Sequence, residues 1–217
     1  MSNMLATRRA MMQFGAWATA AAVLPSIAAG PALAENAGAI SPIEQFDIAL
    51  VMAMKAGKGA PFQQRYAILL PSVDRAFDLQ TILRVSVGPH WTALSADQQQ
   101  QLLTSFRRYT VANFVSNFDS WQGESIQVSP QVRALPNGDQ VVSTSIGKAG
   151  GSPVTLAYVM RQTSAGWKAV DVLADGSISR VAVQRSDFRS LLASGGGSAL
   201  LSSLERKVSD LSGGTLA

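Results

Sequence analysis

The spacing of the hydrophobic positions changes about halfway along the chain. Up to about residue 118, apolar side chains recur every three or four residues, which is the period of an amphipathic helix. From about residue 125 they alternate with polar ones, which is the period of a half-buried strand. Two further helical stretches follow residue 186. Helices, then strands, then helices are typical of an α+β fold.

Four helices are predicted in the first part of the chain. A capping box over residues 41–44, with proline at the first helical position, predicts that the first helix starts there. A short second helix starts at Pro61 and ends or kinks at Pro71. A third helix covers about 78–87, and a second capping box introduces a long helix over about 96–118.

The second part predicts an antiparallel meander. The dipeptide Asn137-Gly138 is a strong hairpin turn signal. The strands fall within about 125–184, and there are four of them, or five if 178–183 also pairs. Two closing helices are expected at about 187–193 and 199–211, with three glycines between them.

Residues 1–34 have the pattern of a cleavable export signal. They hold two arginines and no acidic residue, then an apolar run from Ala10 to Leu24, then the small-residue site Ala32-Leu33-Ala34. That run is shorter than the roughly 20 residues that a membrane-spanning helix needs. We therefore expect cleavage after Ala34 and a periplasmic mature protein, by either the Sec or the twin-arginine route. An uncleaved N-terminal anchor is the alternative.

Charge and composition narrow the possible functions. Without the first 34 residues the chain keeps 16 basic and 14 acidic side chains, so its formal net charge falls from +4 to +2. No basic stripe of the kind that binds nucleic acid is visible, and we expect no nucleic-acid partner. The chain has no cysteine and one histidine, His90, which has no local partner for acid–base work. We expect no metal.

Wide apolar faces are the more prominent feature. The predicted helices and the strand over 154–160 both present large apolar side chains. These faces can simply pack as core. A curved meander with helices laid across it can also leave an apolar cavity between the two layers, and such a cavity is a common kind of ligand site.

Several segments together carry a resemblance to a known family. In the helical half these segments are Val87-Gly88-Pro89-His90-Trp91, Leu94-Ser95-Ala96-Asp97-Gln98-Gln99 and Phe106-Arg107-Arg108-Tyr109. In the second half they are Pro153–Arg161, Gly166-Trp167-Lys168, Asp171-Val172, Gly176-Ser177-Ile178-Ser179, Arg185 and Phe188. In this order they resemble the toluene-tolerance family, the MlaC-like periplasmic lipid-shuttle components of the Mla (maintenance of lipid asymmetry) system. The resemblance runs from about residue 43 to 212. The part from Asp171 to Phe188 is most similar to the branch associated with hopanoid biosynthesis, the HpnM-like branch.

The resemblance implies an NTF2-like α+β fold, in which a curved antiparallel sheet of four to five strands is covered by N-terminal and C-terminal helices around an apolar cavity. Residues 35–217 would form one lipid-binding domain, with a helical half at about 41–118, the sheet at about 125–184 and closing helices at about 186–212. The implied protein is not an enzyme and uses no cofactor. It would carry phospholipid or hopanoid-type lipid between an inner-membrane transporter and an outer-membrane lipoprotein or exporter complex.

The expected site follows from this implied fold. The side chains expected to line the cavity are Leu83, Phe106, Tyr109, Leu156, Tyr158, Met160, Val170 and Val172. Arg161 and Arg185 are the candidates for an anionic headgroup at the rim.

Two other classes of function stay open at this point. NTF2-like cavities also host isomerases and dehydratases that use a carboxylate with a raised pKa, and here Asp78, Asp119 or Asp171 would be the base. A ligand-free periplasmic adaptor of a transporter would instead have a filled core and a large exposed apolar patch.

Overall fold

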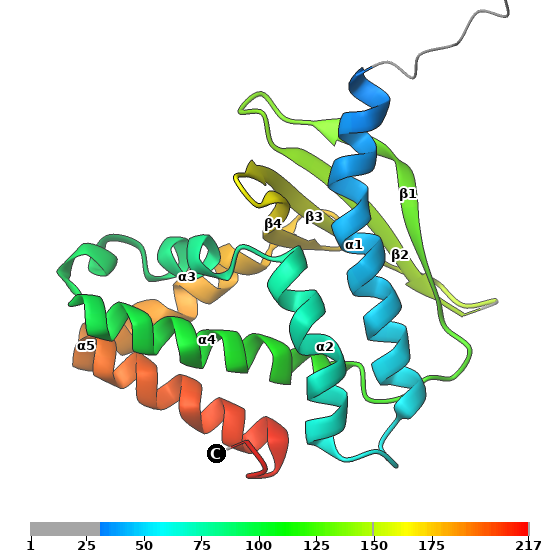
Figure 1. The fold of residues 1–217 in the computed structure, drawn as a ribbon. Coiled ribbons are helices and arrows are strands. Elements are labelled where there is room, and N and C mark those ends of the chain that lie inside the picture. The colour runs from blue at the N-terminus through cyan, green and yellow to red at the C-terminus, as the bar shows by residue number, and fades with distance from the viewer. Residues whose placement is uncertain (1–30, 149, 217) are drawn as a thin grey trace, which may run out of the picture.

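The computed structural model describes residues 31–148 and 150–216 (Figure 1). The export signal predicted for residues 1–34 lies outside the described residues up to residue 30, so it stays a prediction. The helices are α1 (Pro31–Ala56), α2 (Phe62–Ala76), α3 (Leu79–Val87), the 3₁₀ helix η1 (Gly88–Ala93), α4 (Ala96–Asn117) and α5 (Arg180–Ser212). The strands are β1 (Ser125–Ala134), β2 (Gln140–Gly147), β3 (Val154–Thr163), β4 (Gly166–Ala174) and β5 (Ile178–Ser179).

The five strands form one antiparallel, curved sheet in the order β1-β2-β3-β4-β5, which confirms the predicted α+β fold. In Figure 1, α1 runs along the sheet, and α2, α3, α4 and α5 gather beside one end of it. The last strand is shorter than the predicted 178–183. It ends at Ser179 because the hydroxyl of this residue accepts the backbone N–H of Ala182 and so starts α5.

Helix α1 begins at Pro31, so the predicted start at Ser41 is wrong. Pro42 lies inside the helix. The physical reason is burial, because Ala39 and Ile43 lie on the same stripe as Phe46 and all three are fully buried under the sheet. Tertiary packing on this stripe outweighs the local capping preference. Similarly, α2 continues past Pro71 to Ala76.

The capping box at Ser95 is confirmed. The Ser95 hydroxyl accepts the N–H of Gln98 at 3.2 Å, and the Gln98 side chain accepts the N–H of Ser95 at 3.0 Å. The two predicted closing helices are also present, joined as α5 across a kink. Gly195 and Gly196 have non-helical backbone angles there, and Gly196 has φ 60° and ψ −152°. Such angles are adopted essentially only by glycine.

An aromatic cluster lies where α1, α4 and the sheet meet. The ring of Phe46 lies 5.2 Å from that of Phe77, 4.9 Å from that of Phe114 and 6.5 Å from that of Tyr158, between centroids. Edge-on pairs of this kind add stability beyond the area they bury. The cluster joins the α1 side of the core to the space between α4 and the end of the sheet.

Candidate functional site

A cavity of about 350 Å³ opens between the sheet and the helices α3, α4 and α5. Its lining residues are Phe77, Leu79, Ile82, Phe106, Tyr109, Thr110, Asn113, Phe114, Asn117, Phe118, Leu156, Asp171, Val172, Ala174, Arg180, Val181, Val183, Gln184, Asp187, Phe188 and Lys207. This volume lies at the lower end of the range of roughly 300–1,000 Å³ that is common for ligand pockets.

One face of α4 forms a wall of the cavity. The cavity-lining residues of α4 are spaced by one, three or four positions, so they lie on the same side of the helix. They are Phe106, Tyr109, Asn113, Phe114 and Asn117. The face is therefore aromatic with amide groups between the rings. The strands supply an aliphatic wall through side chains of β3 and β4.

The structure brings four of the eight predicted cavity residues together. Phe106 and Tyr109 on α4, Leu156 on β3 and Val172 on β4 all line the cavity. Leu156 pairs with Ala174 of β4, so these two cavity-lining side chains lie on the same face of the sheet.

The other four predicted residues lie in the closed core. Leu83, Tyr158, Met160 and Val170 are all buried and none of them lines the cavity. Tyr158 is opposite Val172 and shares its face of the sheet. The ring of Phe46 from α1 packs against Tyr158, so this part of the face is covered. Contact of any of the eight with a ligand stays a prediction.

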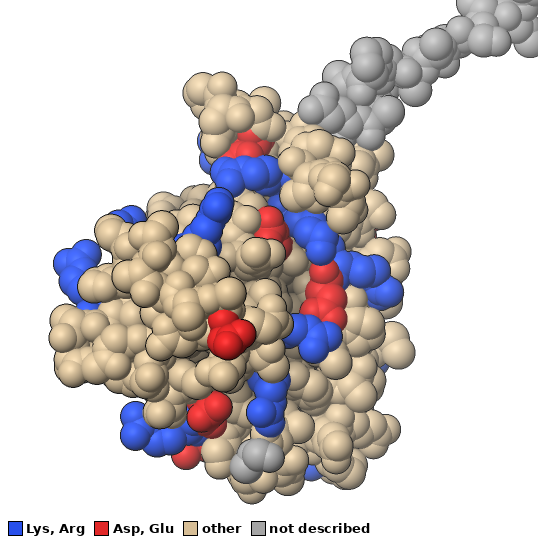
Figure 2. Space-filling view, turned by 60° about the vertical axis from the view of Figure 1, so that its left-hand side comes forward, with Lys and Arg blue, Asp and Glu red and all other residues tan. Residues whose placement is uncertain are grey.

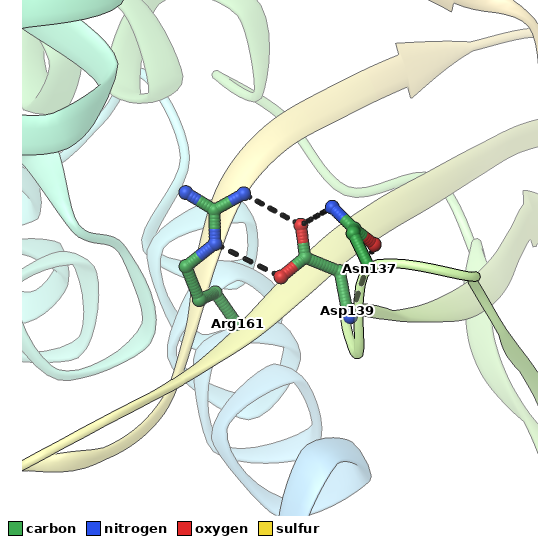
Figure 3. A network of polar contacts seen from close by, with 3 residues as sticks. All are labelled: Asn137, Asp139 and Arg161. Atoms are coloured by element: carbon green, nitrogen blue, oxygen red, sulfur yellow. Dashed lines mark hydrogen bonds and ion pairs between the residues drawn. The ribbon is translucent and has the colours of Figure 1, made fainter.

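The predicted rim arginines lie away from the cavity wall. Arg161 forms a bidentate ion pair with Asp139 at the β1–β2 hairpin, with Nε–Oδ1 2.9 Å and Nη2–Oδ2 2.6 Å, and Asn137 donates to the same carboxylate (Figure 3). The hydrogen bond from Arg161 holds the pKa of Asp139 below its usual value. Arg185 is exposed on α5 with its guanidinium beside Gly88.

Different charged residues lie on the cavity wall. Arg180 and Asp187 of the first half of α5 line it, and so does Lys207 of the second half. The Nζ atom of Lys207 lies 5.5 Å from the centroid of the Tyr109 ring. Sequence reasoning missed these three residues because the kink in α5 decides which of its residues face α4.

The three carboxylates considered as catalytic bases all have structural partners. Asp78 caps α3 by accepting the N–H of Thr81 at 2.9 Å. Asp119 pairs with Lys58 at 3.0 Å, and this hydrogen bond holds its pKa below the usual value. Asp171 lines the cavity, but its carboxylate accepts the N–H groups of Val172 at 2.7 Å and Val181 at 3.1 Å and the Ser179 hydroxyl.

The most perturbed carboxylate, Asp47, lies elsewhere. It is 5% exposed on α1, and within the described ranges neither of its carboxylate oxygens has a hydrogen-bond partner. Burial, with a smaller contribution from the charge of Glu44, raises its pKa to about 7. Its charge contributes to raising the pKa of Tyr158, second to the burial of that ring. Asp47 does not line the cavity, so it is not placed to act on a ligand there.

The other candidates for chemistry are exposed. His90 lies in the exposed 3₁₀ helix η1. Among the residues that the structure describes, no group of three or more His, Cys, Asp or Glu side chains is arranged to hold a metal ion. What the site offers is an apolar, aromatic cavity with charged groups at its edge.

Residues 46–206 match the MlaC family, described as MlaC protein, and the chain therefore belongs to this family. Comparison with the curated proteins gives no match. Among solved structures, the chain is similar to the phospholipid-binding protein from Ralstonia solanacearum in complex with a phospholipid. The TM-score is 0.68 at 19% sequence identity, and the match covers 82% of this chain and 98% of that one. The fold is thus the MlaC, NTF2-like fold.

Proposed function

We propose that this protein is a periplasmic lipid carrier that shelters an acyl or hopanoid chain in the cavity beside α4. The observation that carries the proposal is the apolar cavity of about 350 Å³, walled by Phe106, Phe114 and Leu156. Two findings support it: the chain belongs to the MlaC family, and the similar Ralstonia protein binds phospholipid.

The size of the cavity sets how much lipid it takes as it stands. A methylene group is about as large as a water molecule, which occupies about 30 Å³ of the liquid, so the cavity holds about a dozen methylenes. At about 0.8 kcal/mol for each methylene removed from water, this burial is worth about 10 kcal/mol. The cavity as it stands takes about a dozen methylenes of one chain, and a two-chain lipid or a hopanoid-type lipid requires it to widen.

A lipid carrier needs partners at the membrane. In a bilayer the methylenes are already out of water, so moving them into the cavity gains little free energy. Transfer therefore requires docking that shields the lipid on its way. We propose an inner-membrane transporter and an outer-membrane lipoprotein or exporter complex as these partners. We further propose that the cargo is phospholipid or a hopanoid-type lipid, in keeping with the similarity to the hopanoid-associated branch.

The placement of the carboxylates supports a carrier over an isomerase or dehydratase. Of the three candidate bases, Asp171 lines the cavity, and it is engaged by two backbone N–H groups and a hydroxyl. These bonds occupy both carboxylate oxygens, so Asp171 has a structural role where the last strand meets α5. A ligand-free adaptor is the remaining alternative, and the experiment below separates it from a carrier.

Native mass spectrometry of the mature protein tests the proposal. After incubation with phospholipid vesicles, the wild type is expected to carry bound lipid. Leu156→Trp places an indole in the cavity and should abolish most of this binding. Val154→Trp is the matched control, because Val154 lies on the same strand, is 54% exposed and is outside the cavity. A folded wild type that carries no lipid contradicts the proposal and favours the adaptor.

A further inference from the structure

Three charged side chains on the cavity wall are left without a salt-bridge partner. Arg180, Asp187 and Lys207 make no side-chain hydrogen bond and no ion pair with any described residue, and Lys207 lies over the ring of Tyr109. In the described part of the chain, four Lys or Arg side chains pair with carboxylates, Arg107 with Asp74 among them. The charges at the cavity are therefore available to a ligand.

Tyr109 lies among these three groups. Burial raises its pKa, the charge of Arg180 lowers it and that of Asp187 raises it, so both charges act on its hydroxyl. Lys207 lies over its ring. Arg180 and Asp187 are seven residues apart on α5, which is about two helical turns, so they lie on the same side of the helix. Tyr109 itself lines the cavity.

The charged side chains on the cavity wall have no net charge. Two cations, Arg180 and Lys207, are matched by two carboxylates, Asp171 and Asp187. Asp171 has its oxygens occupied by Val181, Val172 and Ser179, so Asp187 is the carboxylate left to accept a hydrogen bond. Figure 2 shows that Lys and Arg side chains share one face of the molecule with Asp and Glu side chains. A site with two cations and an available carboxylate complements a ligand that carries both signs of charge.

We propose that Arg180, Lys207 and Asp187 form a headgroup site that selects lipids with a phosphate diester and a primary ammonium over lipids with an anionic phosphate alone. Arg180 and Lys207 bind the phosphate oxygens, because guanidinium and ammonium groups form charge-assisted hydrogen bonds with them. Asp187 accepts the ammonium N–H and repels a headgroup of net negative charge. The acyl chain extends past Tyr109 into the apolar part of the cavity.

This inference rests on the proposed function, and the test keeps the two apart. The mature protein is incubated with vesicles of equimolar phosphatidylethanolamine and phosphatidylglycerol, and the bound lipids are counted by native mass spectrometry. The wild type should bind phosphatidylethanolamine in about two- to five-fold excess, which corresponds to one partly exposed ion pair. Asp187→Asn should bring the ratio close to that of the vesicles, because it removes the acceptor of the ammonium group and the charge that repels an anionic headgroup.

Matched variants separate the site from general charge effects. Asp210→Asn removes an exposed carboxylate from α5 away from the cavity and should keep the wild-type ratio. The double variant Arg180→Gln and Lys207→Gln should lower the uptake of both lipids, whereas Arg185→Gln should not. Lipid bound in the vesicle ratio by the wild type, or an unchanged ratio in Asp187→Asn, overturns the headgroup site alone. A wild type with no lipid overturns the carrier as well.

Discussion

The buried carboxylate of Asp47 makes the stability of this protein depend on pH in a direction that can be worked out. Its pKa is raised from the ordinary 3.8 to about 7 in the folded chain, mainly by burial. Below pH 3.8 the group is protonated in both states and costs nothing. As the pH rises from there to about 7, the unfolded chain gains the ionised form that the folded chain resists, so the free energy of unfolding falls.

The size of this change in the free energy of unfolding follows from the difference between the folded and unfolded pKa values of Asp47. A separation of about three pH units, at 1.36 kcal/mol each, amounts to about 4 kcal/mol. Asp47→Asn keeps the shape and removes the ionisation, so it should stabilise the protein by up to about 4 kcal/mol at pH 8. Near pH 4 the difference between variant and wild type should be small.

Urea unfolding followed by circular dichroism at pH 4, 6 and 8 measures this difference. Asp175→Asn, the same change at an exposed position, is the control and should alter the free energy of unfolding little at any pH. Glu44→Gln removes the neighbouring negative charge, so it should lower the pKa of Asp47 and raise stability slightly at pH 8. The reasoning is refuted if the Asp47→Asn variant is less stable than the wild type at pH 8. It is also refuted if the free energy of unfolding changes by the same amount at pH 4, 6 and 8.

Three further predictions concern the elements around the cavity. Gly196→Ala should lower the free energy of unfolding by about 1–3 kcal/mol in urea titrations, because only glycine adopts its backbone angles comfortably and no neighbour lies within 4 Å to clash with a methyl group. Ser95→Ala should cost about 1 kcal/mol, measured in the same way, because it removes the N-cap of α4. Arg161→Gln should cost about 1–2 kcal/mol at neutral pH, allowing for the exposure of Arg161. This last cost should shrink in acid unfolding series, because the ion pair lowers the pKa of Asp139 and its contribution is lost as the pH falls through that lowered value.

Most of the elements could be predicted from spacing and end signals. The alternation over β3, the turn at Asn137-Gly138 and the cap at Ser95 are local features, and the structure bears them out. The start of α1 could not be predicted in this way. The capping signal at Ser41 is worth about 1 kcal/mol, whereas burial of Ile43 and other large side chains on that helix is worth more.

For the cavity, the sequence by itself determined the types of residue and the stripe on α4, because helical spacing places Phe106, Tyr109 and Asn113 on one face. It also held a signal for Asp47, because this charged residue stands within an apolar helical stripe. Only the tertiary structure decided which apolar faces stay open. Phe46 from α1 covers Tyr158, whereas Leu156, two residues earlier on the same strand, still lines the cavity. Local pattern shows that a side chain is apolar, but whether it is covered depends on a helix distant in the sequence.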